Sequence, residues 1–281
     1  MAITHDNQPV RIAIAVVRRD GDATIGLRVT KLDDATRLAI NALIANGDVP
    51  EDVDVHEVGP LFGFAAQDFV SPVTAGVACA NVSGMRGTLG CFVRVNGNVC
   101  VLSANHVLAL ENQAPTGSNI VQPVNGALAV QTIGTLLDFE SLTHDGNLFD
   151  GAIASVDLDS SDFDVRLFNG KHISSARTSP LNQGDRVSKF GQASEETSGR
   201  IFASTVSNVV IQMDSGQYGF DQQIEVVPDG DGPFSIRGDS GSLVYDDNDQ
   251  AVGIVIGGNG TDRTYVSPIG ALLTRFHAHL A

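Results

Sequence analysis

The chain has 281 residues, enough for one large domain or two smaller ones and for a core that needs neither disulfides nor a metal. Hydrophobic residues make up 42% and charged residues 18%, which excludes a disordered chain. The formal net charge of −16 argues against nucleic acid and anionic membranes as partners, and we expect neither. Asp supplies 26 of the 33 acidic residues, and with 30 Gly this favours short strands joined by turns.

The cysteines and the first residues predict a protein of a reducing compartment. Cys79, Cys91 and Cys100 are odd in number and lack CxxC spacing, which argues against a disulfide framework and a zinc site. The chain starts without the basic and apolar segments of a signal peptide, and no apolar run reaches the roughly 18 residues of a membrane span. We therefore expect a cytoplasmic protein with free thiols.

The first 60 residues predict a small ββαβ module. Two apolar runs, 10–17 and 23–29, flank Asp20-Gly21-Asp22 and indicate a hairpin. Asp33 and Asp34 then precede apolar residues at helical spacing, and residues 53–58 alternate as a strand.

The module is followed by a stretch rich in Gly, Ala and Ser at 59–87, which is the predicted linker. We expect residues 1–70 to comprise the α+β module and linker, and residues 71–281 a second domain. A regulatory partner is one expectation for the module.

From residue 88 onward, short strands alternate with turns. Asn96-Gly97, between strands 91–95 and 99–103, is a strong signal for a two-residue hairpin. A terminal helix is predicted over 268–280. The pattern favours an antiparallel barrel or sandwich. Further predicted strands span 130–137, 151–156, 186–190, 199–207, 223–227, 242–245, 252–256 and 264–267.

The segment Gly238-Asp239-Ser240-Gly241 is the strongest chemical signal in the sequence. It places a hydroxyl between glycines, where a substrate backbone can approach and where main-chain N–H groups can face an oxyanion. Taken alone, the alternative interpretation of this segment is a glycine-rich turn before a strand.

Two further residues could serve that hydroxyl. His106 follows the predicted strand 99–103 and could act as its base, because a serine hydroxyl needs a base with a pKa near 7. Asp150 opens the apolar stretch 151–154 and could orient an imidazole. In isolation, His106 could be a structural histidine and Asp150 a strand cap. His277 and His279 would face apart on the predicted helix, which argues against a metal site there.

Together the three motifs occur in the order His, Asp, Ser, and the chain then resembles a trypsin-like serine protease of the chymotrypsin fold. The resemblance covers about residues 85–281, and the whole chain is most similar to bacterial relatives of the plant narrow-leaf proteases. It implies a mostly β fold of two six-stranded antiparallel barrels with a C-terminal helix. The matching pieces are 103–106, 150–154, 238–241, 252–258 and 264–268.

The resemblance implies a serine endopeptidase that works through an acyl-enzyme intermediate on a protein or peptide, without a cofactor or metal. It makes Ser240 the nucleophile, His106 its base and Asp150 the group that orients His106. The N–H groups of Gly238 and Ser240 would form the oxyanion hole. Gly257 and Gly258 would line the bound substrate strand.

The sequence departs from animal trypsins at several positions. Ile256 stands where those enzymes usually carry a serine, and Ser242 where they carry a glycine. No activation cleavage site precedes Thr88, so Asp239 lacks the freed amine that would usually pair with it. The resemblance therefore leaves the means of activation open.

Position 234 suggests which side chains the enzyme accepts. The residue six before the nucleophile lies at the base of the primary pocket in this family, and here it is Phe234. A phenyl ring cannot pair with Lys or Arg, so we expect apolar or small residues before the cleaved bond. Arg263 could instead select an acidic residue, and Asp262 a basic one.

Two functions of other classes compete with an active endopeptidase. The missing activation site permits a catalytically latent protease-fold protein that binds or regulates. A serine esterase of the α/β-hydrolase type shares the chemistry, but its triad runs Ser, Asp, His along the chain.

Overall fold

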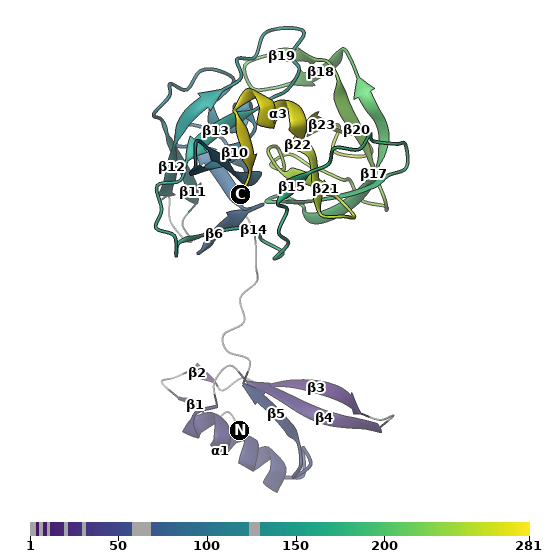
Figure 1. Ribbon diagram of the computed structural model, residues 1–281. Coiled ribbons are helices and arrows are strands. Elements are labelled where there is room, and N and C mark those ends of the chain that lie inside the picture. Colours follow the sequence, from purple (N-terminus) through teal and green to yellow (C-terminus); the bar gives the residue numbers. More distant parts are fainter. Residues whose placement is uncertain are drawn as a thin grey trace. The chain divides into compact units, whose positions relative to one another are not determined.

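The computed structural model describes residues 4–5, 8–9, 12–19, 22–29, 32–57, 69–123 and 130–281. The chain divides into two compact units, residues 1–64 and 65–281, which are described separately (Figure 1). Among the described helices, none is both long and apolar enough to cross a membrane.

The first unit has the predicted ββαβ order. Strands β3 (Ile12–Arg19) and β4 (Asp22–Val29) form an antiparallel pair, and β5 (Asp54–Glu57) joins β4 in parallel after the helix α1 (Asp34–Ala45). Two short strands, β1 (Thr4–His5) and β2 (Gln8–Pro9), pair separately. The predicted turn residues Asp20 and Gly21 lie outside the described residues.

Helix α1 begins at the acidic pair Asp33-Asp34, as the sequence predicts. Asp33 is the N-cap, and its carboxylate accepts a hydrogen bond from the N–H of Thr36 at 2.9 Å. Ile40 of α1 is buried together with Leu27 and Val29 of β4. A small apolar core thus holds the helix on the sheet.

The second unit is built from two sheets. The first has eight strands in the order β24-β9-β10-β13-β12-β11-β7-β8. Strands β9 and β10 are joined by Asn96-Gly97, where φ is +50° and +84°, as the predicted hairpin requires. Its strands are β7 (Ala78–Asn81), β8 (Gly87–Thr88), β9 (Cys91–Val95), β10 (Asn98–Ser103), β11 (Asn119–Pro123), β12 (Val130–Phe139), β13 (Ala152–Ser155) and β24 (Ala278–Leu280).

The second sheet has the order β15-β22-β21-β16-β17-β20-β23, and a further pairing of β22 with β23 closes six of its strands into a barrel. Its strands are β15 (Ser175–Ala176), β16 (Arg186–Gly191), β17 (Glu195–Val206), β20 (Gln223–Pro228), β21 (Leu243–Asp246), β22 (Gln250–Gly258) and β23 (Thr264–Pro268).

Two strand pairs and two helices complete the second unit. Strands β6 (Val73–Ala75) and β14 (Phe163–Leu167) pair in parallel, and β18 (Val209–Gln212) and β19 (Gln217–Phe220) form a hairpin. The helices are α2 (Asn105–Leu108) and the C-terminal α3 (Ile269–Arg275).

The predicted fold class is confirmed, because strands make up 45% of the structure and helices 10%, in the arrangement of the chymotrypsin fold. The two halves differ in closure. The second sheet forms a closed six-stranded barrel, whereas the first is curled but open, since β24 and β8 are its two edges.

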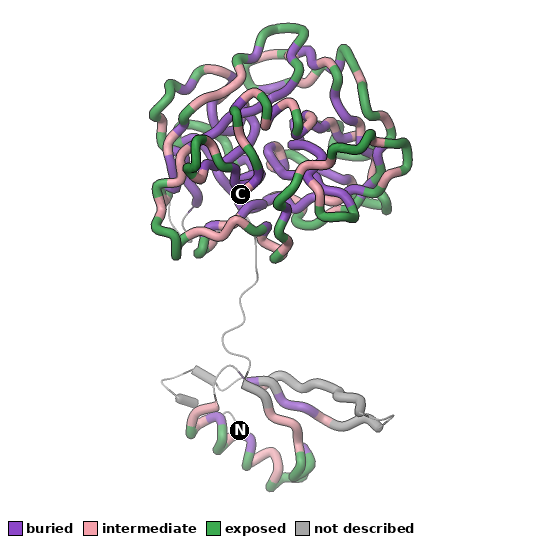
Figure 2. The backbone as a smooth tube through the Cα atoms, in the orientation of Figure 1, coloured by how far each residue is buried: buried purple, intermediate pink, exposed green. Residues whose placement is uncertain are grey.

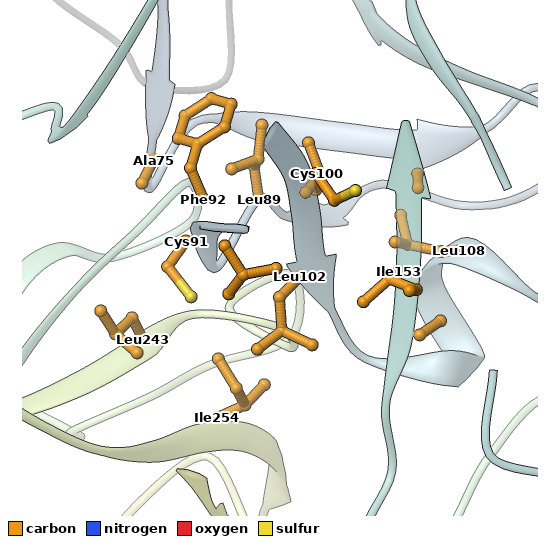
Figure 3. Packing of buried hydrophobic residues seen from close by; sticks show 14 of the residues in the cluster. Ala75, Leu89, Cys91, Phe92, Cys100, Leu102, Leu108, Ile153, Leu243 and Ile254 are labelled. Atoms are coloured by element: carbon orange, nitrogen blue, oxygen red, sulfur yellow. The ribbon is translucent and has the colours of Figure 1, made fainter. Parts of the chain in front are cut away.

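One apolar cluster joins the two sheets. Leu243 of β21 and Ile254 of β22 lie in the same buried cluster as Cys91 and Leu102 of the first sheet (Figure 3). The buried segments accordingly run through the strands of both sheets (Figure 2). The segment between β20 and β21, which contains Ser240, is also held from both sheets: the N–H of Thr88 donates to the carbonyl of Ser240, and the N–H of Gly241 donates to the carbonyl of Val255.

Two sequence predictions are corrected. The predicted linker 59–87 extends too far, because β6, β7 and β8 fall within it and most of their residues are buried. Its small residues serve close packing: a Cβ at Gly87 would lie 3.0 Å from the carbonyl oxygen of Ser240. The predicted helix 268–280 ends at Arg275, since His277 has φ +49° and residues 278–280 pair with β9.

Candidate active site

Adjacent strands bring His106 and Asp150 together. Strand β10 pairs with β13 so that Ser103 faces Ala152, which places α2, just after β10, beside Asp150, two residues before β13. The Nδ1 atom of His106 is hydrogen-bonded to Oδ2 of Asp150, and the N–H of His106 donates to Oδ1 at 3.2 Å. A carboxylate at Nδ1 holds the proton there and leaves Nε2 free to act as a base.

Asp150 is fully buried, and its position is fixed by a serine that the sequence did not single out. Its N–H donates to Oγ of Ser267 at 3.1 Å, and Ser267 donates to Oε1 of Gln223 at 3.0 Å. Ile256 is buried in an apolar cluster, so it contributes no polar contact to Asp150. No sequence motif predicts the hydrogen bond between Asp150 and Ser267, because the two residues are 117 positions apart.

The loop that carries Ser240 is held by Thr88. The N–H of Thr88 donates to the carbonyl of Ser240 at 2.8 Å, and its hydroxyl donates to the carbonyl of Gly238 at 2.9 Å. Gly238 and Gly241 have φ of +106° and +92°, which favours glycine. A Cβ at Gly241 would lie 2.2 Å from Oγ of Ser103. The two glycines of the motif are therefore structural requirements of the loop.

Asp239 has a partner within the chain. Its Oδ2 lies 3.4 Å from Nζ of Lys189, and both side chains are fully buried. The carboxylate also accepts hydrogen bonds from the N–H groups of Ala193, Ser194 and Ile236. The sequence did not identify Lys189 as the partner of Asp239, because nothing in the order of the chain links strand β16 to the segment at 238–241.

His106 and Ser240 line one open groove of about 1390 Å³. Among the described residues, the N–H groups of Gly238 and Ser240 donate to no acceptor, as an oxyanion hole requires. No hydrogen bond joins Ser240 to His106 in the described part of the chain; such contacts are often long in unliganded enzymes.

The predicted substrate-binding residues fall into two groups. Gly257 and Gly258 line the groove. Phe234 is 1% exposed and packs in the apolar core of the second barrel, while its neighbour Ser235 lines the groove. Arg263 pairs with Glu225 at 3.0 Å and lies over the ring of Phe202, outside the groove lining.

The groove also has a wall that the sequence analysis missed, the β18–β19 hairpin. Its residues 210–214 line the groove, and its tip is tied to Glu111 by the N–H groups of Asp214 and Ser215 at 3.0 and 2.8 Å. The signal available in the sequence was the apolar run Val209-Val210-Ile211 of β18. Within the described ranges, no group of three or more His, Cys, Asp or Glu residues is placed to hold a metal.

The pKa of His106 is raised above its ordinary value. Burial would lower it, but the charge and hydrogen bond of Asp150 outweigh that effect, and the charges of Glu111 and Asp214 add to the increase. The surrounding carboxylates therefore stabilise the imidazolium that forms when His106 takes a proton.

The fold and this site define the chain as a member of the trypsin family. The family profile, described as Trypsin, matches residues 68–276, which is well over half of the chain. An α/β-hydrolase is thereby excluded, because that class is built on a different fold. No curated protein matches the chain.

Solved structures show the same fold at low identity. A glutamic acid-specific serine protease described as using a novel histidine triad in substrate binding is 21% identical, with a TM-score of 0.55, over 74% of this chain and 100% of that one. Protease A of Thermobifida fusca is 18% identical, with a TM-score of 0.52, over 74% and 98%. The Nocardiopsis protease NAPase is 20% identical, with a TM-score of 0.51, over 76% and 98%.

Proposed function

We propose that the protein is a serine endopeptidase that cleaves peptide bonds through His106, Asp150 and Ser240. The observation that carries the proposal is the hydrogen bond from His106 to the buried Asp150 at the edge of a groove that also holds Ser240. Membership of the trypsin family supports the same chemistry.

In the proposed reaction, Oγ of Ser240 attacks the carbonyl carbon of the peptide bond while Nε2 of His106 takes its proton. The N–H groups of Gly238 and Ser240 receive the oxyanion of the tetrahedral intermediate, and each such donor contributes about 3 kcal/mol to catalysis. His106 then gives its proton to the leaving amine, and water hydrolyses the acyl-enzyme in the same way. The buried Asp150 stabilises the imidazolium in both steps.

The groove supports a preference for apolar or small side chains. Its rim includes Met85, Val210 and Ile236, which are large apolar residues with exposed fractions of 58%, 60% and 39%. Exposed apolar side chains around a groove are typical of a binding surface.

The proposal also includes a cytoplasmic location and kinship with bacterial relatives of the plant narrow-leaf proteases. The three free, buried cysteines are compatible with a reducing compartment.

Reaction with a fluorophosphonate tests the proposal directly. We expect covalent labelling of Ser240 in the full-length chain, located by mass spectrometry, and no labelling of the variant Ser240→Ala. The variant Ser242→Ala is a matched control that should still be labelled at Ser240. Ser242 is buried, and its hydroxyl donates to the carbonyl of Asp239 at 2.6 Å. Labelling at another serine, or labelling of Ser240→Ala equal to that of the native chain, would contradict the proposal.

A further inference from the structure

Arg237 connects two walls of the groove close to Ser240. Its Nη2 lies 3.4 Å from Sδ of Met85, in the loop between β7 and β8, and 3.3 Å from Oδ1 of Asp214, at the tip of the β18–β19 hairpin. All three residues line the groove that holds Ser240. A peptide bound in this groove can therefore reach the guanidinium of Arg237.

The ion pair between Arg237 and Asp214 opens easily. The two side chains are 78% and 69% exposed. Exposed pairs contribute little to stability, because water and salt screen their attraction. A charged group of a bound peptide can thus take the place of either partner.

The two partners differ in their freedom to move. Asp214 is anchored, because its N–H and that of Ser215 donate to the two oxygens of Glu111, which is 8% exposed. Arg237 reaches its partners through a long, exposed side chain, and both contacts use the same nitrogen, Nη2. On binding of a peptide, the arginine is the partner that can change position.

A guanidinium binds a carboxylate through two parallel N–H groups, a geometry that neither Met85 nor the single contact with Asp214 provides. Arg86 adds a second cationic side chain to the groove lining. We propose that Arg237 is a specificity-determining residue that leaves Asp214 and binds an acidic side chain of the substrate within two residues of the cleaved bond, at a position other than the one directly before it. This inference rests on the proposed endopeptidase function.

Peptides that differ only in Glu or Gln test the inference in the full-length protein. One such pair is made for each of the two positions before and the two positions after the cleaved bond, and kcat/KM is measured for all. At one position or more, other than the one directly before the cleaved bond, we expect Glu to be favoured about tenfold, the effect of a charge-assisted hydrogen bond. The ratio falls to about one in Arg237→Gln and rises in Asp214→Asn, which removes the competing carboxylate.

Arg263→Gln is the matched control, because Arg263 is a cation that pairs with Glu225 and lies outside the groove lining. It should keep the preference for Glu. If Arg263→Gln removed the preference and Arg237→Gln kept it, or if all four pairs gave a ratio near one, the inference would be wrong. A preference for Lys that disappears in Asp214→Asn would also overturn it.

Binding to Ser240→Ala separates this inference from the proposed function. Fluorescence anisotropy of the same labelled peptides measures affinity without turnover, again with and without Arg237→Gln. Tighter binding of the Glu peptide that depends on Arg237, in a native chain that neither cleaves peptides nor reacts with the fluorophosphonate, would refute the endopeptidase and support the inference. Equal binding of Glu and Gln peptides would refute the inference even where the native chain cleaves both.

Discussion

The Nζ atom of Lys189 lies 3.4 Å from Oδ2 of Asp239, the residue directly before Ser240, and neither side chain is exposed to solvent. Burial lowers the pKa of Lys189, whereas the nearby carboxylate of Asp239 opposes that change. The lysine also donates to Oγ of Ser194 at 2.7 Å and to the carbonyl of Glu195 at 3.0 Å. A side chain of the chain itself thus supplies the positive charge behind the Ser240 loop.

Replacing Lys189 by Met should impair both stability and reactivity. Removal of one partner of a buried ion pair typically costs about 3–5 kcal/mol, because the other charge stays buried without compensation. We expect a loss near the lower end, since Asp239 keeps its backbone hydrogen bonds. Urea unfolding measures the loss of stability, and fluorophosphonate labelling of Ser240 measures the disturbance of the loop.

The control for Lys189→Met is the double variant Lys189→Met with Asp239→Asn. It should be more stable than the sum of the two single variants predicts, because it leaves no unpaired buried charge. Additive losses would show that the two residues are not coupled.

Replacing Asp150 by Asn should lower turnover about 10⁴-fold with little change in folding, because an amide at this position favours the wrong tautomer of His106. The measurement is kcat on a peptide substrate, with circular dichroism as the check on folding. Asp145→Asn is the control: Asp145 is 81% exposed and lies five residues earlier. A greater loss in Asp145→Asn would show that the wrong acid has been assigned.

The pH dependence of kcat/KM should follow His106. The base must be neutral, and its pKa is raised, so activity should increase with pH through a midpoint above about 6.5. Asp214→Asn should move this midpoint to lower pH, because it removes one of the charges that raise the pKa. Asp247→Asn, whose charge is not among these causes, should leave the midpoint in place. A midpoint that rises in Asp214→Asn would contradict the assignment.

The same raised pKa has a consequence for stability. The stabilisation of the folded state by the His106–Asp150 interaction should be fully present below the pKa of His106 in the unfolded chain, about 6.5. This stabilisation should be lost as the pH rises through the higher pKa of His106 in the folded protein.

Gly241→Ala should destabilise the second unit by more than an ordinary glycine replacement. Gly241 combines φ of +92° with a Cβ position 2.3 Å from the carbonyl oxygen of Thr88, a backbone atom that cannot move aside cheaply. Gly117→Ala is the matched control, because Gly117 has φ of +86° but no atom within 4 Å of its Cβ position. We expect about 1 kcal/mol for Gly117→Ala and clearly more for Gly241→Ala in urea unfolding. Equal losses would mean that backbone strain alone matters.

A fragment of residues 65–281 should fold and react with the fluorophosphonate as the full chain does. The reason is that, among the described residues, every apolar cluster lies wholly within one unit. Thermal unfolding of the fragment and of the full chain should give the same midpoint for the second unit. A fragment that aggregates or fails to label would show that residues 1–64 are needed for the protease fold.

The sequence alone determined the features that depend on local patterns. The start of helix α1 after Asp33, the Asn96-Gly97 hairpin and ten of the nineteen described strands of the second unit follow from spacing and turn residues that act over a few positions. The order of His106, Asp150 and Ser240 predicted the family, because each stands in a short recognisable motif. The small residues between 73 and 87 were misread as a linker, since composition does not distinguish a flexible stretch from tightly packed strands.

Only the tertiary structure decided which distant residues complete the site. The contacts of Lys189 with Asp239, of Ser267 with Asp150 and of Arg237 with Asp214 join positions 50, 117 and 23 residues apart. Such pairs leave no periodic signal along the chain, because they arise from the closure and register of the sheets. The chain order thus revealed the reacting groups, whereas sheet pairing and burial determined how they are held and what surrounds them.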